Sequence, residues 1–181
     1  MRYEIEEYGV SPISLFEAQQ YCKVETEDDN TSLTILIGAV VKFAEDMTHR
    51  EVRNNKWFAY LDSFGECLEI RKTVVQAITK IEYTLDGNVL ELDASNYYLK
   101  KGVISSWVEL TDSGAWPTVD NATDAIRISF TTSPDMRLPI IKVQMLKHLL
   151  HAYENRGDES TDPIYGFESA DFYKSVSIPN I

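Results

Sequence analysis

Apolar side chains recur every three or four positions in two long segments, one in each half of the chain. Between residues 31 and 50 they are Leu33, Leu36, Ile37, Val40, Ala44 and Met47, and between 138 and 156 they are Ile140, Val143, Leu146, Leu149 or Leu150, and Tyr153. This spacing places them on one face of a helix. The sequence therefore predicts helices over 31–50 and 138–156, the second opening at Pro139 and ending before Gly157.

A capping signature predicts a shorter helix over residues 14–24. Glu17 follows Ser14 by three positions. The Ser14 hydroxyl can therefore accept a hydrogen bond from the Glu17 amide while the Glu17 carboxylate accepts one from the Ser14 amide. The acidic residues that follow predict a loop, in which Asp29 or Asn30 is placed to cap the next helix.

Residues 57–132 follow a different pattern, in which short β-branched and aromatic runs are separated by turn residues. Apolar and polar residues alternate over 125–132, which is typical of an antiparallel strand with one buried face. Asp86-Gly87-Asn88 predicts a hairpin turn. The predicted strands cover 57–61, 67–70, 77–85, 89–92, 97–99, 104–110 and 125–132.

Together these elements predict an α+β fold. In it, two N-terminal helices and one long C-terminal helix form a helical bundle, with a small antiparallel β-element between them and an extended C-terminal tail. Residues 1–157 are expected to form a single domain and residues 158–181 the tail. The tail holds Tyr165, Phe167, Phe172 and Tyr173 among polar and turn residues. Two interpretations stand: a segment that orders on a partner surface, or one that packs back on its own domain.

The helix predicted over 31–50 is apolar over more than one stripe, because Ile35, Val41 and Phe43 broaden its face. Such a helix is either deeply buried or packed against a neighbouring subunit. We therefore take these three residues as candidate inter-subunit contacts. His148 and His151 on the last helix are candidates for the same interface.

Charge and cysteine content disfavour two classes of protein, those that bind DNA phosphates and those held together by disulfides or zinc. The 181 residues include 29 acidic and 17 basic side chains, a formal net charge of −12. This charge disfavours binding to DNA phosphates, yet it suits the wall of a passage through which DNA must slide. Cys22 and Cys67 are not spaced for a disulfide scaffold or a zinc site, which favours a reducing cytoplasm. We expect no signal peptide in the acidic opening residues and no membrane span in 33–41.

Candidate metal sites have weak patterns. His148, His151 and Glu154 lie at helical steps of three, so a metal site is conceivable, but such steps drift around the helix and the HExxH spacing is absent. The acidic residues 25–29 lack the alternating ligands and the turn glycine of an EF-hand loop. We expect no metal and no cofactor.

Candidate catalytic groups are equally unspecific, and we expect no catalytic residue. The strands contain the carboxylates Glu69, Glu82, Glu91 and Glu109, and the tryptophans of the chain are Trp57, Trp107 and Trp116. A pair of carboxylates can serve glycoside hydrolysis, and tryptophans can form a sugar-binding platform. A small carbohydrate-active enzyme or binding module is therefore the alternative from another class.

Three segments, taken in order, resemble the bacteriophage head–tail connector family of adaptor and head-completion proteins. Residues 13–24 with the helix 31–50 resemble the family's "-SLEEAK-x-x-L-(R/K)-(I/V)-" opening, and residues 74–83 resemble its "-PVQSVTSVxY-" strand. Residues 96–99 look like its "-YxL/V-" element, Trp116-Pro117 like its "WP", and residues 138–156 like its last helix, which ends in "YENR". The resemblance covers about residues 13–157. The proline before Val74 is missing, and the first 12 residues and the tail are not covered.

The resemblance implies a structural virion protein without catalysis. A family member forms a ring, here expected to be a dodecamer, below the portal protein, and the ring receives the next neck or tail component, a stopper or tail terminator. Genomic DNA passes through the channel without specific binding. The expected location is the virion neck, with host cytoplasm during assembly. The resemblance also implies a tail that reaches the portal, for which Tyr165, Phe167, Phe172 and Tyr173 are the candidates. A tail terminator or stopper ring is the close alternative.

Overall fold

The computed structural model describes residues 1–158, 162–166 and 170–178. The chain forms two compact units, each built from two separate stretches: a β unit of Met1–Gly9 and Arg53–Pro134, and a helical unit of Val10–Val52 and Asp135–Ile181. The division expected at residue 157, between a single domain and a tail, stays a prediction. Among the described helices, none has both the length and the apolar character needed to cross a membrane.

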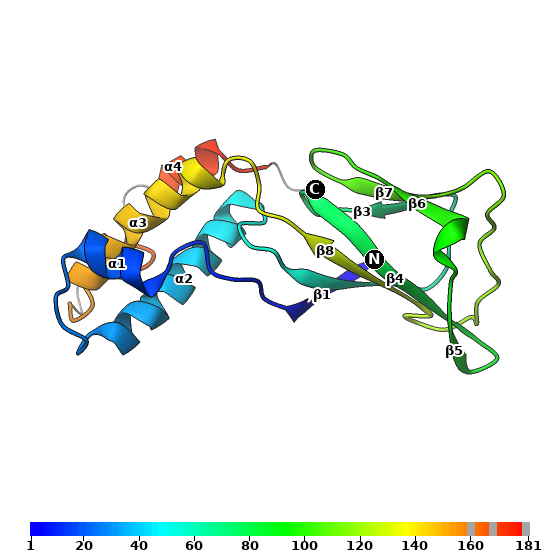
Figure 1. The fold of residues 1–181 in the computed structure, drawn as a ribbon, viewed down its shortest axis with the longest axis horizontal. Helices are drawn as coiled ribbons and strands as arrows, with labels where there is room; N and C mark the ends of the chain where they lie inside the picture. The colour runs from blue at the N-terminus through cyan, green and yellow to red at the C-terminus, as the bar shows by residue number, and fades with distance from the viewer. Residues whose placement is uncertain (159–161, 167–169, 179–181) are drawn as a thin grey trace. The chain divides into compact units, whose positions relative to one another are not determined.

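The β unit contains two antiparallel sheets (Figure 1). The larger sheet has the strand order β1-β2-β8-β4-β5, and the smaller one has the order β3-β7-β6. The strands are β1 Arg2–Glu7, β2 Lys56–Leu61, β3 Leu68–Ile70, β4 Val75–Leu85, β5 Asn88–Glu91, β6 Tyr97–Lys100, β7 Ser106–Leu110 and β8 Ile126–Thr132.

Strand β8 pairs with β2 on one side and β4 on the other. Ile126, Ile128 and Phe130 are buried, whereas Arg127 and Ser129 are half-exposed, because successive residues of a strand point to opposite faces. The buried side chains join residues of both sheets in one apolar cluster, which includes Leu68, Ile70, Ile81 and Val108. The predicted half-buried antiparallel strand is therefore confirmed.

The hairpin between β4 and β5 turns at Asp86 and Gly87. Both residues have a positive φ, 51° and 74°, as a two-residue type I′ turn requires. Leu85 then lies opposite Asn88 across the hairpin. The carboxylate of Asp120 accepts hydrogen bonds from both turn amides, each at 2.9 Å. The predicted hairpin turn is confirmed.

The predicted fold class is wrong in its proportions. Eight strands in two sheets make up a complete unit, whereas the sequence predicts a helical bundle with one small β-element. Over its described residues the structure is α+β with eight strands and four helices. Strand β1 was missed altogether, although its Tyr3 and Ile5 pack against the core of the β unit. Its partner β2 lies far along the chain, so no local pattern identifies the pairing.

The helical unit contains α1 Leu15–Cys22, α2 Asn30–Thr48, α3 Leu138–Glu154 and the short α4 Ala170–Ser175. Each of the three predicted helices is confirmed, with ends within two residues of the expected positions. The core of the unit consists of buried side chains from all of these helices, among them Ala18, Val40, Ala44, Ile141, Met145, Leu149 and Tyr173.

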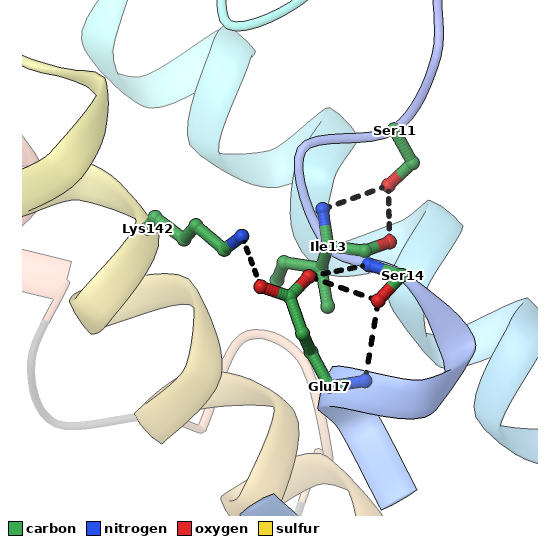
Figure 2. Close-up of polar contacts among 5 residues, drawn as sticks. All are labelled: Ser11, Ile13, Ser14, Glu17 and Lys142. Carbon is green, nitrogen blue, oxygen red and sulfur yellow. Dashed lines mark hydrogen bonds and ion pairs between the residues drawn. The ribbon is translucent and has the colours of Figure 1, made fainter.

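The predicted capping box at the start of α1 is present (Figure 2). The Ser14 hydroxyl accepts from the Glu17 amide at 3.2 Å, and the Glu17 carboxylate accepts from the Ser14 amide at 2.9 Å. The other Glu17 oxygen accepts from the Lys142 ammonium on α3 at 2.5 Å. The Lys142 hydrogen bond, followed by that of the Ser14 amide, lowers the pKa of Glu17 to about 2. Glu17 thus both caps α1 and joins it to α3.

Arg50, which follows α2, connects three segments of the helical unit. Its guanidinium donates to Asp135 at 2.7 Å and to the carbonyl of Val176 at 2.6 Å. Asp135 also accepts from the Arg137 amide at 2.8 Å, at the start of α3. The side chains of Arg50 and Asp135 are only 10% and 5% exposed. Because a charge buried to this degree has lost most of its water, removal of one partner leaves the other uncompensated.

Asp135→Ala is expected to lower the free energy of unfolding by about 3–5 kcal/mol, the usual effect of breaking a buried ion pair. Asp46→Ala is the matched control, because the Lys42–Asp46 pair is 54% and 61% exposed and should contribute under about 1 kcal/mol. Urea unfolding followed by circular dichroism measures both. Equal losses for the two variants would contradict the role given to Asp135.

Ser14→Ala is expected to destabilise the helical unit by about 1 kcal/mol, since the Glu17 amide loses its acceptor. Ser14→Thr keeps a hydroxyl at the same position and should retain most of the stability. The same urea titration compares them, and an alanine variant as stable as the wild type would show that the cap is dispensable.

Candidate assembly surfaces

The outer face of α2 is defined by Thr31, Ile35, Gly38, Lys42 and Asp46, which are all exposed. Their spacing of three or four residues puts them on one side of the helix. Val40 and Ala44, on the opposite side, are fully buried. Ile35 is 66% exposed, so a large apolar side chain lies in water on a helix whose other side forms the core.

The outer face of α3 is defined by Ile140, Val143, Lys147 and Glu154, with Met136 just before the helix; these side chains are exposed as well. Ile140 and Val143 are 56% and 53% exposed. They lie opposite Ile141, Met145 and Leu149, which are buried. Each long helix therefore leaves apolar side chains exposed on its outer side.

The predicted inter-subunit residues separate into two groups. Ile35 lies on the outer face of α2, and His151 is half-buried. Val41, Phe43 and His148 are buried inside the helical unit. Their burial is explained by the unit's own core, where Phe43 keeps 8% of its surface exposed. A role in an inter-subunit interface stays a prediction for all five residues.

The C-terminal segment packs on its own helical unit over residues 170–178. Tyr173 of α4 is buried, Phe172 packs against the same core, and the Ile178 amide donates to the Thr48 carbonyl at 2.9 Å. Packing on the chain's own domain, one of the two interpretations of the tail, therefore holds for these residues. Tyr165 is 77% exposed. Phe167 lies outside the described residues, and portal contact through the tail stays a prediction.

His148 fastens the segment before α4. Its Nε2 lies 2.8 Å from the Ile164 carbonyl oxygen, and its ring meets Phe43 edge-on at a centroid distance of 5.0 Å. Burial lowers the pKa of His148 more strongly than the Ile164 hydrogen bond raises it. A neutral ring with Nε2–H donating to Ile164 fits this site. Across the described ranges, no group of three His, Cys, Asp or Glu side chains is placed to hold a metal ion.

The acidic loop before α2 also differs from expectation in one detail. Asp29 occupies the N-cap position of α2, but its side chain makes no capping hydrogen bond. Its carboxylate instead accepts from the Tyr153 hydroxyl at the end of α3 and, at 3.4 Å, from Arg156, which follows that helix. Glu25, Glu27 and Asp28 are exposed. The predicted side-chain cap is wrong because a tertiary contact competes for the carboxylate.

The strand carboxylates are engaged with cations. Glu82 is buried and accepts from Arg127, at 2.6 and 2.8 Å, and from Lys80 at 2.7 Å. Burial raises the pKa of Glu82, but the hydrogen bonds and charges of Lys80 and Arg127 outweigh it, so the pKa is lowered. On the smaller sheet, Tyr98 and then Lys100 lower the pKa of Glu109 by hydrogen bonding. A general acid for glycoside hydrolysis needs the opposite shift.

Trp57 and Trp116, two of the three tryptophans, pack in the β unit, whereas Trp107 on β7 is half-exposed. Trp57 on β2 is buried under the Lys72 ammonium, which lies 3.7 Å from its ring centroid. Trp116 stacks on Phe64 with centroids 4.7 Å apart and planes at 6°. Trp57 and Trp116 both pack against the apolar core of the unit. They therefore offer little ring surface for a sugar.

Replacing His148 by leucine is expected to change the response of stability to acid. The pKa of His148 is lowered in the folded state, so the unfolded chain takes up the proton first as pH falls below about 6.5, and the folded state loses stability. His148→Leu should be less stable than the wild type at pH 7.5 but should lose less on acidification to pH 5. Thermal unfolding at both pH values measures this, with His49→Asn as the control for losing a histidine. If wild type and His148→Leu lose the same stability between pH 7.5 and pH 5, the lowered pKa given to His148 is contradicted.

Comparison with known proteins gives similarity in structure but not in sequence. The sequence matches no protein-family model and no curated protein. The structure is similar to a chain in "Virion of native gene transfer agent (GTA) particle" with a TM-score of 0.71, in "Neck of empty GTA particle computed with C6 symmetry" with 0.69, and in "Neck of native GTA particle computed with C12 symmetry" with 0.58.

These similarities extend over both units. They cover 100% of this chain and 97–98% of the matched chains, at 13% sequence identity in each case. At this identity the similarity concerns the fold. The chain therefore has the fold of chains found in gene transfer agent particles, including two structures of the particle neck.

Proposed function

We propose that this chain is a structural protein of the neck of a phage-like particle, a head-to-tail connector (adaptor) subunit. In this role it forms a ring below the portal protein, extends the DNA channel, and provides the attachment surface for the next neck or tail component. The observation that carries the proposal is the full-length similarity to chains in neck structures. The ordered sequence motifs over about residues 13–157 resemble the connector family independently.

A ring of identical subunits fits the same observations. Two of the similar chains belong to necks computed with C6 and C12 symmetry, which supports a dodecamer for this chain. A ring is built from a contact between two different surfaces of each subunit. The outer faces of α2 and α3 supply two such surfaces. Ile35, on the outer face of α2, is a proposed inter-subunit contact.

The charge of the chain agrees with a channel that DNA passes without specific binding. Each subunit has a net charge of −12. A phosphate and a carboxylate in close contact repel by about 1 kcal/mol in water and more where water is scarce. Salt limits this repulsion to about 8–10 Å, a distance that still matters in a narrow channel. The proposed partners are thus the portal and the next neck component, in the virion and, during assembly, in the host cytoplasm.

Portal contact and the pKa values of the strand carboxylates distinguish the adaptor from the two alternative functions. A tail terminator or stopper ring shares the ring-forming fold but would not sit directly on the portal. A carbohydrate-active enzyme requires a carboxylic acid with a raised pKa, and the pKa values of Glu82 and Glu109 are lowered. The adaptor proposal is therefore distinguished by portal contact.

Co-expression with the portal protein of the same genome tests the proposal. We expect a complex with one ring of this chain on the portal, visible by cryo-electron microscopy and countable by native mass spectrometry. Tyr165→Ala should weaken portal binding because Tyr165 is the exposed aromatic residue of the tail, whereas Tyr8→Ala, an exposed tyrosine of the β unit, should not. Binding to a tail component but not to the portal would favour the terminator or stopper alternative. Binding to neither would contradict the proposal.

A further inference from the structure

The outer face of α3 is basic over most of its length in a strongly acidic chain. From Met136 to Tyr153 the charged residues other than histidine are Arg137, Lys142 and Lys147, and the acidic Glu154 follows at the C-terminal end of the same face. Lys142 is paired with Glu17. Arg137 and Lys147 are exposed and, within the described residues, form no ion pair. The apolar side chains of Ile140 and Val143 therefore lie between two unneutralised cations.

The outer face of α2 carries no net charge of its own, but the loop that leads into it is acidic. Lys42 is neutralised by Asp46 one turn away. Glu25, Glu27 and Asp28, in the loop that leads into α2, are exposed and make no ion pair with any described part of the chain. An acidic loop thus adjoins the N-terminal end of α2, whereas the apolar residues of α3 are flanked by the basic Arg137 and Lys147.

Gly38 gives a second reason to expect a neighbour on α2. It lies in the middle of the helix on the outer face, where alanine would be more favourable than glycine. A Cβ at this position would meet no atom of the chain within 4 Å. No described part of the subunit therefore requires a glycine here, whereas close approach of another backbone would.

We infer that the outer face of α3 of one copy binds the outer face of α2 of the next copy, head to tail. Apolar side chains would meet at the centre, and opposite charges would meet at the rim, the arrangement typical of specific interfaces. A symmetric contact would instead place α3 cations against α3 cations, or α2 acids against α2 acids. The inference rests on the proposed ring function, because a contact between two unlike faces closes into a ring when its rotation fits.

Variants with one disabled face give a sharp test with the full-length protein. Ile35→Asp disables the α2 face and Val143→Asp the α3 face; both side chains are exposed, so folding should persist and circular dichroism can check it. In sedimentation experiments we expect the wild type to self-associate with concentration. Each variant alone should associate at least about tenfold more weakly. An equimolar mixture of the two variants should form dimers but no larger species. The intact α3 face of Ile35→Asp can bind the intact α2 face of Val143→Asp, and no further pair of intact faces remains.

Charge reversal tests the rim of the interface. Lys147→Glu should weaken association about tenfold, and mixing that variant with Glu27→Lys/Asp28→Lys should recover part of the loss. Lys174→Glu is the matched control, since Lys174 is an exposed cation of α4 in the same unit. Gly38→Ala should raise the thermal midpoint but weaken association, a combination that a folding defect cannot produce.

The results separate this inference from the proposed function. A wild type that is monomeric up to about 1 mM, or a mixture of the two face variants that stays monomeric, would overturn the head-to-tail contact. Association by Val143→Asp alone would show an α2–α2 contact, and association by Ile35→Asp alone an α3–α3 contact, both of which contradict it. If a complete ring still forms on the portal with both face variants, the inference fails while the proposed function stands. Absence of wild-type binding to the portal counts against the function itself.

Discussion

The helical unit has more apolar surface than its own helices can cover. A helix packed on one side buries one stripe of side chains. In α2 this stripe contains Leu33, Val40 and Ala44, all fully buried, while Ile35 on the other side is exposed. Complete burial of a side chain of this size is worth about 1.5–3 kcal/mol. A second copy or a virion component that covers such residues recovers this free energy, and the proposed assembly depends on that difference.

The C-terminal segment packs against the helices of the helical unit and completes its core. Tyr173 and Val176 fill the core next to α2, and the Arg50 guanidinium holds the Val176 carbonyl. His148 holds the preceding turn through Ile164. The described residues 170–178 therefore act as part of the fold, and Tyr165 is the most exposed of the described tail aromatics proposed to contact the portal. A contact that uses Tyr173 would require the segment to leave its site and expose the core.

The features that the sequence could predict are those set by neighbours in the chain. The Ser14–Glu17 capping box, the Asp86-Gly87 turn and the alternation in β8 depend on residues a few positions apart, and all are present. The features it missed depend on distant residues. Strand β1 forms by pairing with the distant strand β2. The Asp29 carboxylate accepts a hydrogen bond from Tyr153 instead of capping α2. The breadth of the apolar face on α2 was visible, but whether Val41 is covered by the same chain or by a neighbour is a property of the folded unit.

The net negative charge of the chain opposes the association of its subunits. Two subunits that each carry a charge of −12 repel at every separation, and screening by salt weakens that repulsion beyond about 8–10 Å. Contacts made by Arg137 and Lys147 act only at short range, where they oppose the repulsion locally. Because exposed ion pairs contribute little each, they determine orientation more than affinity. In the proposed contact, the exposed side chains of Ile35, Ile140 and Val143 would therefore supply most of the free energy of association.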